Sequence, residues 1–157
     1  MNTGVYPSTR WDIGLTAEFL RNSDVVETIL LAKKSGKYGP DWSLKEELLK
    51  AFDGDGEFWT MWIEDCIVGI GGLVPTQVQP EAVIWFLGTD LADSQWRTMT
   101  RYCRKMKNKW SADGWILHNV VPLSDRLRIS WLRHLGFDII SERANDPFEG
   151  FVPFMSL

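Results

Sequence analysis

The stretch that most limits the possible folds is Glu81–Trp110, where an apolar run leads through a short turn into a long amphipathic segment. The run 82–87 is expected to be a buried strand, and a helix is expected to start near Asp93. The first N–H groups of a helix have no partner inside it, so a strand that leads into a helix N-terminus is a common place to hold an anion. The first question about function is therefore whether this turn can hold a phosphate.

The segment after the turn has one apolar face and one basic face. Its apolar residues recur at steps of three and four, which is the spacing of one side of an α-helix. The sequence therefore predicts a buried face made of Trp96, Met99, Cys103, Met106 and Trp110. Arginine and lysine occupy the rest of the helix, where a solvated positive face is expected.

The rest of the chain alternates helices with strands. Residues 1–9 are expected to be a loose arm. Apolar periodicity, turn residues and capping patterns predict the other elements. They are a first strand at 11–15, helices at 25–34, 44–52 and 123–135, a hairpin of strands 58–64 and 67–74, and strands at 115–121, 137–141 and 151–155. The resulting order is β-α-α-β-β-β-α-β-α-β-β.

Two features of these elements predict how they pack. Glycines inside a strand usually mark a bulge or a close approach of another part of the chain. Such glycines occur in the second hairpin strand, at Gly69, Gly71 and Gly72. The helix at 123–135 is expected to bury one face, made of Leu123, Leu127, Trp131 and Leu135.

Size and composition indicate an ordinary globular protein with one domain spanning residues 1–157. The chain is 45% hydrophobic and 24% charged, and a chain of this length buries about two thirds of its unfolded surface. No apolar run approaches the roughly 20 residues of a membrane span, and the N-terminus lacks the apolar core of a signal peptide. We therefore expect no membrane partner. The single cysteines Cys66 and Cys103 lie in no metal-ligand spacing, so packing roles in a reduced compartment are expected, and no metal site.

The net charge of −4 is unevenly distributed. Residues 1–90 carry 7 basic and 14 acidic groups, whereas residues 91–157 carry 10 basic and 7 acidic groups. The basic second half could face an anionic partner. The overall acidity nevertheless argues against a dedicated DNA-binding protein, which normally shows a concentrated basic surface.

The order of elements resembles that of the GCN5-related N-acetyltransferase (GNAT) superfamily, an α/β fold built on a mixed sheet. The segment SDRLRISWLRHLGF at 124–137 is similar to a conserved segment of that superfamily, in which an Asn precedes a helix that ends in Gly-Phe. Gly136-Phe137 match that pattern, and Asp125 stands where the Asn is usual. A closer resemblance joins this segment with WFLGTD at 85–90 and the final FVPFMSL. Together they resemble GNAT-like internal virion proteins of short-tailed bacteriophages.

The resemblance implies where an acyl-CoA cofactor would bind. In the superfamily, the pantetheine arm pairs with the exposed edge of the central strand, and the pyrophosphate lies on the next helix N-terminus. The corresponding cofactor-binding residues are Phe86, Leu87, Gly88 and Thr89 on the strand, with Ser94 at the helix and Asp125 in the later segment. Backbone N–H groups of the strand would polarise the thioester carbonyl, as an oxyanion site does.

Three tests on the residues argue against full catalytic competence. The superfamily surrounds the pyrophosphate with a glycine-rich loop, but no glycine follows Gly88 here, and Asp90 and Asp93 place two carboxylates at the helix mouth. Those carboxylates are expected to cap the helix themselves. A Tyr commonly protonates the CoA thiolate in the superfamily, and the matching position is Leu132, which cannot donate a proton. The candidates for a general base are Glu57, Glu64, Asp90 and His118, none of which is singled out by spacing, so the catalytic residues stay unknown.

Three functions therefore remain open. The leading hypothesis is a phage GNAT-fold protein with lost or reduced catalysis and no cofactor. It would act through contacts with other virion proteins, in the virion interior or the host cytoplasm. The alternative is an active acyl-CoA-dependent N-acetyltransferase that modifies a protein or small amine, with acetyl-CoA as its cofactor. The third is a packaging factor that contacts nucleic acid through the basic helix face 97–109.

Overall fold

The computed structural model describes residues 2–156, in a chain that divides into two compact units. The first unit comprises Met1–Val74 and Trp85–Cys103, and the second comprises Pro75–Ile84 and Arg104–Leu157. Strand β4 (Glu81–Gly88) and helix α5 (Trp96–Ala112) each contribute residues to both units. The expectation of one domain stays a prediction.

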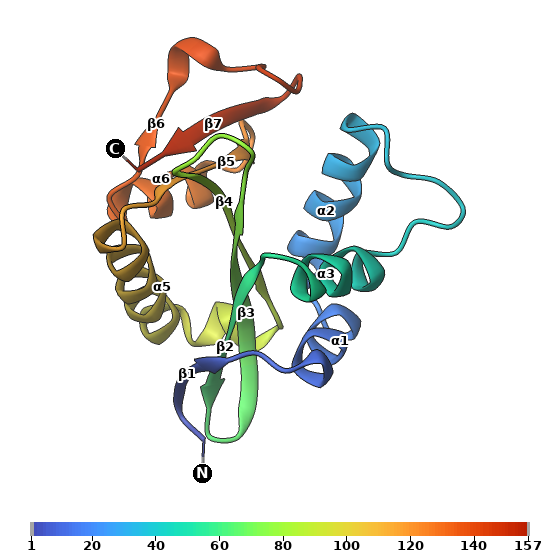
Figure 1. The fold of residues 1–157 in the computed structure, drawn as a ribbon, viewed down its shortest axis with the longest axis vertical. Helices are drawn as coiled ribbons and strands as arrows, with labels where there is room; N and C mark the ends of the chain where they lie inside the picture. Colours follow the sequence, from blue (N-terminus) through green and yellow to red (C-terminus); the bar gives the residue numbers. More distant parts are fainter. Residues whose placement is uncertain (1, 157) are drawn as a thin grey trace. The chain divides into compact units, whose positions relative to one another are not determined.

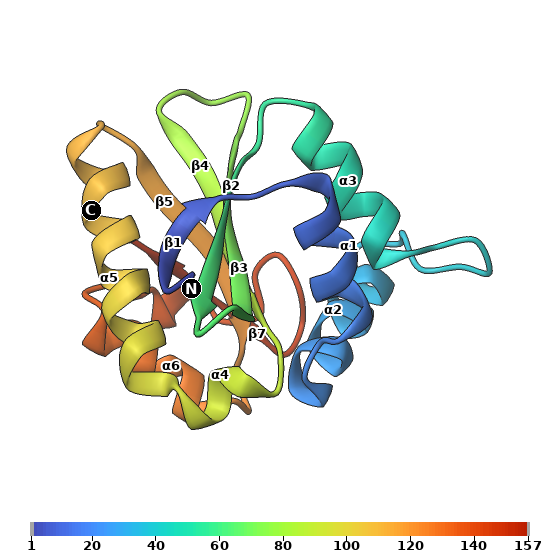
Figure 2. The ribbon, with the colours of Figure 1, turned by 90° about the horizontal axis from the view of Figure 1, so that it is seen from below.

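The first unit contains three helices, then a hairpin and the second half of β4, and after these a short helix and the start of a long one. Figures 1 and 2 show all three helices on the same side of β2 and β3. The elements are β1 (Gly4–Pro7), α1 (Arg10–Glu18), α2 (Asn22–Lys34), α3 (Leu44–Asp53), β2 (Glu57–Ile63), β3 (Cys66–Pro75), the short α4 (Leu91–Ser94) and the start of α5.

The second unit contains the first half of β4, the end of α5 and the C-terminal elements. These are β5 (Ile116–Pro122), α6 (Arg126–His134), β6 (Asp138–Ile139), a 3-10 helix η1 (Ser141–Arg143) and β7 (Phe151–Met155). The strands of the chain are hydrogen-bonded in the order β1-β2-β3-β4-β5-β7-β6. Strands β4 and β5 are parallel, whereas β1–β2, β2–β3, β5–β7 and β6–β7 are antiparallel. The sheet is therefore mixed, which confirms the predicted α/β class.

The core of the first unit is apolar and forms between its helices and the hairpin. The buried side chains come from α1, α3, β2, β3 and β4 and are Ile13, Leu48, Phe58, Ile70 and Leu87. The indole of Trp85 packs edge-on against Phe58, with ring centroids 4.8 Å apart. Contacts of this kind add about 0.5–1.5 kcal/mol to the burial of the rings.

The glycines of β3 let the aromatic residues of β4 lie close to its backbone. A Cβ atom on Gly72 would lie 2.2 Å from Cζ2 of Trp85, and one on Gly69 would lie 2.6 Å from Cζ of Phe86. These distances are far below van der Waals contact, so only glycine admits the two rings. The predicted close approach is confirmed, and the rings themselves make it.

In the second unit, the buried apolar side chains come from several elements, among them α5, β5, α6 and β7. The rings of Phe137 and Phe154 meet edge-on at 5.2 Å. Two basic side chains of α5 reach the C-terminal end of α6, where Arg104 Nη2 lies 3.4 Å from the carbonyl of His134 and Lys107 Nζ lies 3.4 Å from that of Gly136. Cations are favourable there because the last carbonyls of a helix carry partial negative charge.

Two predictions near the N-terminus are wrong. Residues 1–9 were expected to form a loose arm, but Gly4–Pro7 is strand β1, paired with β2. Residues 11–15 were expected to form a strand, but they lie in α1. The cause is a capping box: Thr9 Oγ1 accepts from the N–H of Asp12, and Asp12 Oδ2 accepts from the N–H of Thr9. These two bonds satisfy the first donors of the helix and outweigh the weak alternation of the segment.

The other predicted helices and strands are present, except that the strand expected at 137–141 is only the two-residue β6, and Ser141 lies in η1. The buried residues also differ in part from those predicted. On α5, Met99, Met106 and Trp110 are buried as predicted, but Trp96 is exposed because the helix starts only at that residue. On α6, Leu127 is 86% exposed and Leu123 precedes the helix. The buried residues near its C-terminal end are Leu132 and Leu135.

No helix within residues 2–156 has both the length and the apolar character needed to cross a membrane.

Replacing Gly72 by alanine is expected to destabilise the fold by about 1–3 kcal/mol, because the new methyl group would displace Trp85 from its contact with Phe58. Urea unfolding followed by tryptophan fluorescence measures the change. Gly39→Ala is the matched control, since a Cβ atom there meets nothing within 4 Å. Equal stability of the two variants would contradict the packing role of Gly72.

Candidate functional site

The C-terminal end of β4 is the segment to which the sequence assigns cofactor binding. The structure shows that the backbone groups of Gly88 and Thr89 already have partners within the first unit. The N–H of Gly88 donates to Asp24 Oδ2 at 2.7 Å, and its carbonyl accepts from the N–H of Arg21 at 2.9 Å. The N–H of Thr89 donates to the carbonyl of Val68, and its carbonyl accepts from Ala92. The segment that joins α1 to α2 therefore covers this end of the strand, where Leu20 and Thr89 form an antiparallel bridge.

Three charged side chains hold that segment against β4. Asp24 is almost fully buried, and its Oδ2 also accepts from Nε of Arg21 at 2.8 Å. Nη1 of Arg21 donates to Asp93 Oδ1, also at 2.8 Å. Arg21 is 13% exposed and Asp93 is 72% exposed, so one carboxylate of the cluster is buried and the other faces solvent.

The guanidinium of Arg21 stays charged in this setting. Burial alone would lower the pKa of Arg21, but the charges and hydrogen bonds of Asp24 and Asp93 more than offset it, so the pKa lies above its ordinary value. The guanidinium also lies over the ring of Phe86, 5.9 Å from its centroid, within the range of a cation–π contact. Arg21 thus links both carboxylates to the aromatic face of β4.

Because Gly88 has no side chain, Arg21 and Ala92 can lie close to its backbone. A Cβ atom there would lie 2.7 Å from Cβ of Ala92 and 3.2 Å from Nε of Arg21. The sequence suggested that Gly88 allows a cofactor to approach closely. In the structure, Arg21 and the first turn of α4 make the close approach.

The N-terminus of the helix after β4 is not capped by its acidic residues as the sequence predicted. The first piece, α4, has only four residues, and its N-cap residue Asp90 makes no side-chain capping bond. Asp93 pairs with Arg21 instead. Ser94, a predicted cofactor-binding residue, is exposed and donates to the carbonyl of Leu91. The predicted cap is therefore wrong for Asp90, and a distant arginine makes the ion pair with Asp93.

The side chains of Phe86 and Leu87, the other two predicted residues of β4, pack inside the first unit. Leu87 belongs to the core of the first unit, and the ring of Phe86 lies on Gly69. The structure thus brings together Phe86, Leu87, Gly88, Thr89 and Ser94 as neighbours in one unit. That they bind acyl-CoA stays a prediction.

The remaining predicted residues lie in the second unit. Asp125 is the N-cap of α6, where its Oδ1 accepts from the N–H of Arg128 at 3.1 Å. Its role there is that of an ordinary helix cap. Leu132, which occupies the position of the usual proton donor, is buried. Strand β5 pairs with β4 only as far as Val83 and His118; beyond that, Asn119 Nδ2 donates to the carbonyl of Ile84 at 2.7 Å.

The four candidate general bases are in four different situations. Glu57 accepts from the indole N–H of Trp59 at 2.7 Å. Glu64 lies in the β2–β3 turn with φ +49°, and Asp90 is exposed. Nε2 of His118 is buried without a hydrogen-bond partner among residues 2–156, and Oε2 of Glu81 lies 4.0 Å from it. That distance is too long for a hydrogen bond.

Metal and thiol chemistry gain no support from the described residues. In residues 2–156 no three His, Cys, Asp or Glu side chains gather as metal ligands would. Cys66 is exposed at the start of β3, contrary to the expected packing role. Burial raises the pKa of Cys103 from 9.0 to about 12, only partly countered by the charge of Arg21. The thiol of Cys103 is therefore neutral at physiological pH and is a poor nucleophile.

Sequence reasoning did not identify Arg21 and Asp24 as residues of this site. Asp24 was considered only as a possible helix cap. The two residues are three apart, a common spacing for a local ion pair, and that was the available signal. Their contact with Gly88 joins residues 64 positions apart, and no local pattern reveals it.

Several solved structures that are similar to this chain over nearly its full length are named as N-acetyltransferases. The GCN5-related N-acetyltransferase from Kribbella flavida aligns with a TM-score of 0.68 at 16% identity, covering 96% of this chain and 94% of that one. The PaiA N-acetyltransferase from Thermoplasma acidophilum, in complex with coenzyme A, gives 0.65 at 14% identity, covering 99% of each chain. Ribosomal-protein-alanine N-acetyltransferase from Brucella melitensis gives 0.67 at 11% identity, covering 98% of each chain.

These likenesses establish the fold. The chain has the GNAT acyl-CoA N-acyltransferase fold, as the sequence predicted. At such low identity they do not establish the activity. No protein-family model matches the sequence, and no curated protein matches it either.

Replacing Asp24 by alanine is expected to lower the free energy of unfolding by about 3–5 kcal/mol, because the N–H of Gly88 loses its acceptor and Arg21 loses its buried carboxylate and keeps only the solvent-exposed Asp93. Asp93→Ala removes the other carboxylate of the same arginine, but at a solvent-exposed position. It should change the stability by less than about 1 kcal/mol. Chemical unfolding of both variants gives the comparison. A similar loss in both would show that Asp24 is not the residue that holds the segment to β4.

Proposed function

We propose that this chain uses the GNAT fold as a scaffold for protein–protein contacts, with acetyl transfer lost or reduced. We further propose that it serves as an internal virion or assembly protein of a short-tailed bacteriophage. The observation that carries the first part is the bond between Asp24 and the N–H of Gly88. The second part is supported by the resemblance in WFLGTD, in the segment 124–137 and in the final strand.

The bond to Asp24 makes cofactor binding at this edge costly. A pantetheine amide that paired with the N–H of Gly88 would have to displace a buried carboxylate. A hydrogen bond to a charged group contributes about 1.5–3 kcal/mol, which corresponds to roughly a tenfold to hundredfold loss of affinity. In the superfamily, the pyrophosphate would lie at the start of the next helix. Here Asp90 and Asp93 stand at that place without a glycine-rich loop, and their charges repel an anion.

Loss of the proton donor points in the same direction. The position of the usual Tyr holds the buried Leu132, and no tyrosine occurs in α6. The three tyrosines lie elsewhere, Tyr6 in β1, Tyr38 after α2 and Tyr102 in α5. A thiolate leaving group would have to be protonated by water.

The second candidate is an active acyl-CoA-dependent N-acetyltransferase acting on a protein or small amine. It is favoured by the fold, because the similar structures are named as acetyltransferases and one is a complex with coenzyme A. Acetyl-CoA would then be the cofactor. For this activity, the segment 20–24 would have to move away from β4.

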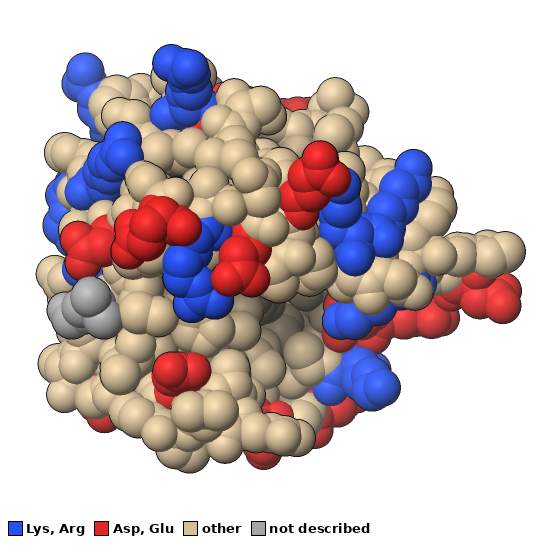
Figure 3. Space-filling view, turned by 90° about the horizontal axis from the view of Figure 1, so that it is seen from above, with Lys and Arg blue, Asp and Glu red and all other residues tan. Residues whose placement is uncertain are grey.

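A nucleic-acid-contacting role has less support. The basic side chains of α5 include Arg97 and Arg101, which lie over the rings of Trp96 and Tyr102 at 5.4 and 5.9 Å. On the face that Figure 3 shows, basic and acidic side chains are interspersed. A dedicated phosphate-binding surface needs a field of one sign, and a net charge of −4 gives the chain no overall positive field.

Acetyl-CoA at millimolar concentration is expected to leave the melting temperature of this protein unchanged. Ligand at 100 times its dissociation constant would add about 2.7 kcal/mol, which for a chain of this length raises the melting temperature by about 5–10 °C. The coenzyme A-bound enzyme from Thermoplasma acidophilum serves as the positive control. A clear rise, with release of free coenzyme A when amines are added, would establish the enzyme instead.

Purified phage particles are expected to contain the protein in a protease-protected form. Mass spectrometry of protease-treated particles should detect its peptides, and opening the capsid before protease treatment should remove them. A major capsid protein from the same particles controls for loading. Particles that lack the protein would refute the virion role, and this outcome is independent of whether acetyl-CoA binds.

A further inference from the structure

The second unit contains a pocket that has no part in the site described above. It lies between α6 and the chain from β6 to β7, and its volume is about 330 Å³. This is near the lower end of the range of ligand pockets, about 300–1,000 Å³, and fits one or two amino-acid side chains. The lining residues that define its chemistry are Arg126, Ile129, Ser130, Arg133, Ser141 and Val152.

Three of these residues lie along one side of α6. Arg126, Ser130 and Arg133 are spaced four and three residues apart, so their side chains follow one another along the helix. At 1.5 Å per residue, the two arginines are separated by roughly 10 Å along the axis. Ser141, at the start of η1, adds a second hydroxyl from the other side of the pocket.

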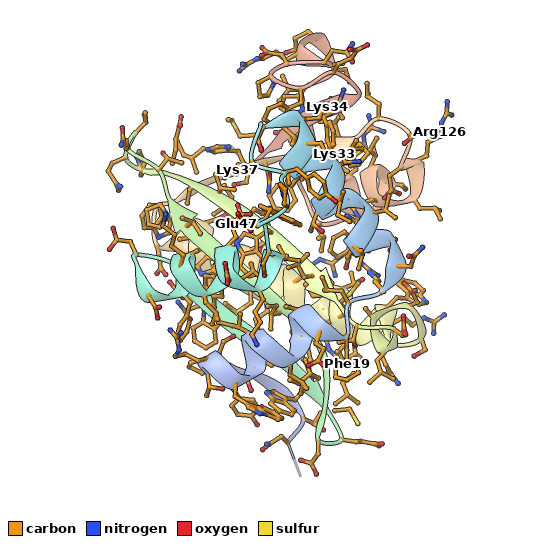
Figure 4. All side chains as sticks on the ribbon, turned by 90° about the vertical axis from the view of Figure 1, so that its right-hand side faces the viewer. Phe19, Lys33, Lys34, Lys37, Glu47 and Arg126 are labelled. Carbon is orange, nitrogen blue, oxygen red and sulfur yellow. The ribbon has the colours of Figure 1, made fainter. Side chains whose placement is uncertain are left out.

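The side chains of Arg126 and Arg133 make no polar contact within the part of the chain that the structure describes. Within residues 2–156, neither Arg126 nor Arg133 has an ion pair or a hydrogen bond from its side chain, and both are exposed. Nearby arginines of the same unit behave differently, since Arg128 pairs with Asp125 and Arg143 pairs with Asp146. Figure 4 labels Arg126 on α6. Among residues 2–156 no acidic residue lines the pocket, so the lining does not neutralise the two positive charges.

The floor between the charges is apolar. Ile129 comes from α6, Ile139 from β6 and Val152 from β7. A free inorganic anion would occupy one arginine and leave this floor exposed to water. A ligand that satisfies the whole pocket carries two carboxylates about two helix turns apart, with an aliphatic group between them. Arginine binds carboxylates through two parallel N–H bonds, which favours this class of ligand over a cationic or neutral one.

We infer that the pocket between α6 and the β6–β7 chain binds an acidic peptide segment of a partner protein, in which an aliphatic side chain lies between two carboxylates. Exposed arginines around an apolar centre are typical of contact sites between proteins. The inference names the chemistry of a partner for the proposed scaffold role. It uses none of the residues that decide whether acetyl-CoA binds.

The test is fluorescence anisotropy with the full chain and a labelled octapeptide of alternating glutamate and leucine. Two matched peptides, with lysine in place of glutamate and with serine in place of leucine, separate the charge from the apolar contribution. The glutamate–leucine peptide should bind at least tenfold more tightly than either control. Equal binding of the glutamate–serine peptide, or displacement of the first peptide by millimolar inorganic phosphate, would overturn the inference in favour of a simple anion site.

Variants locate the binding on the protein. Arg126→Glu and Arg133→Glu should each weaken the peptide at least tenfold, and Ser130→Trp should block it by filling the pocket. All three positions are exposed, so the fold should tolerate these changes, which thermal unfolding checks. Lys105→Glu on α5 makes the same charge change at an exposed position outside the pocket lining and should leave binding intact. Loss of binding in that control to the same degree, or no binding by the wild-type chain, would refute the site. A failed acetyl-CoA experiment would leave these measurements unaffected.

Discussion

The bond between the buried carboxylate of Asp24 and the N–H of Gly88 is the interaction on which the character of the candidate site depends. A buried carboxylate is tolerable only if it is paired and hydrogen-bonded, and here a backbone N–H and the guanidinium of Arg21 fulfil that need. Because the same arginine is also bound to Asp93, the contact spans the α1–α2 connection, the end of β4 and the next helix. The edge that carries the cofactor in the superfamily is thereby used to hold the fold together.

Internal packing also explains three glycines of this chain. Gly69 and Gly72 leave space for the rings of Phe86 and Trp85, and Gly88 leaves space for Arg21 and Ala92. In each case the backbone is approached by another part of the protein itself. A glycine next to a cofactor edge is thus weak evidence for a cofactor, since internal packing imposes the same requirement on the residue.

The two units carry different features. The first holds the end of β4 through the bond of Asp24 to Gly88, while the second has an apolar pocket whose two arginines form no ion pair within residues 2–156. Under the proposed scaffold role, the first feature would serve stability and the second would serve contact with a partner protein. A fold constrains function much less than the residues of its sites do, so both proposals depend on these residues rather than on the fold.

Local periodicity and residue type were enough to predict the α/β class, the positions of most helices and strands, and the absence of a glycine-rich loop after Gly88. They were not enough at residues 11–15, where the capping box of Thr9 and Asp12 outweighed a weak strand pattern, or at Leu127, where periodicity alone did not fix which face of α6 is buried. No local pattern could show that Arg21 and Asp24 cover the end of β4. Asp24 and Gly88 are 64 positions apart, and only the folded backbone brings the donor and the acceptor within bonding distance.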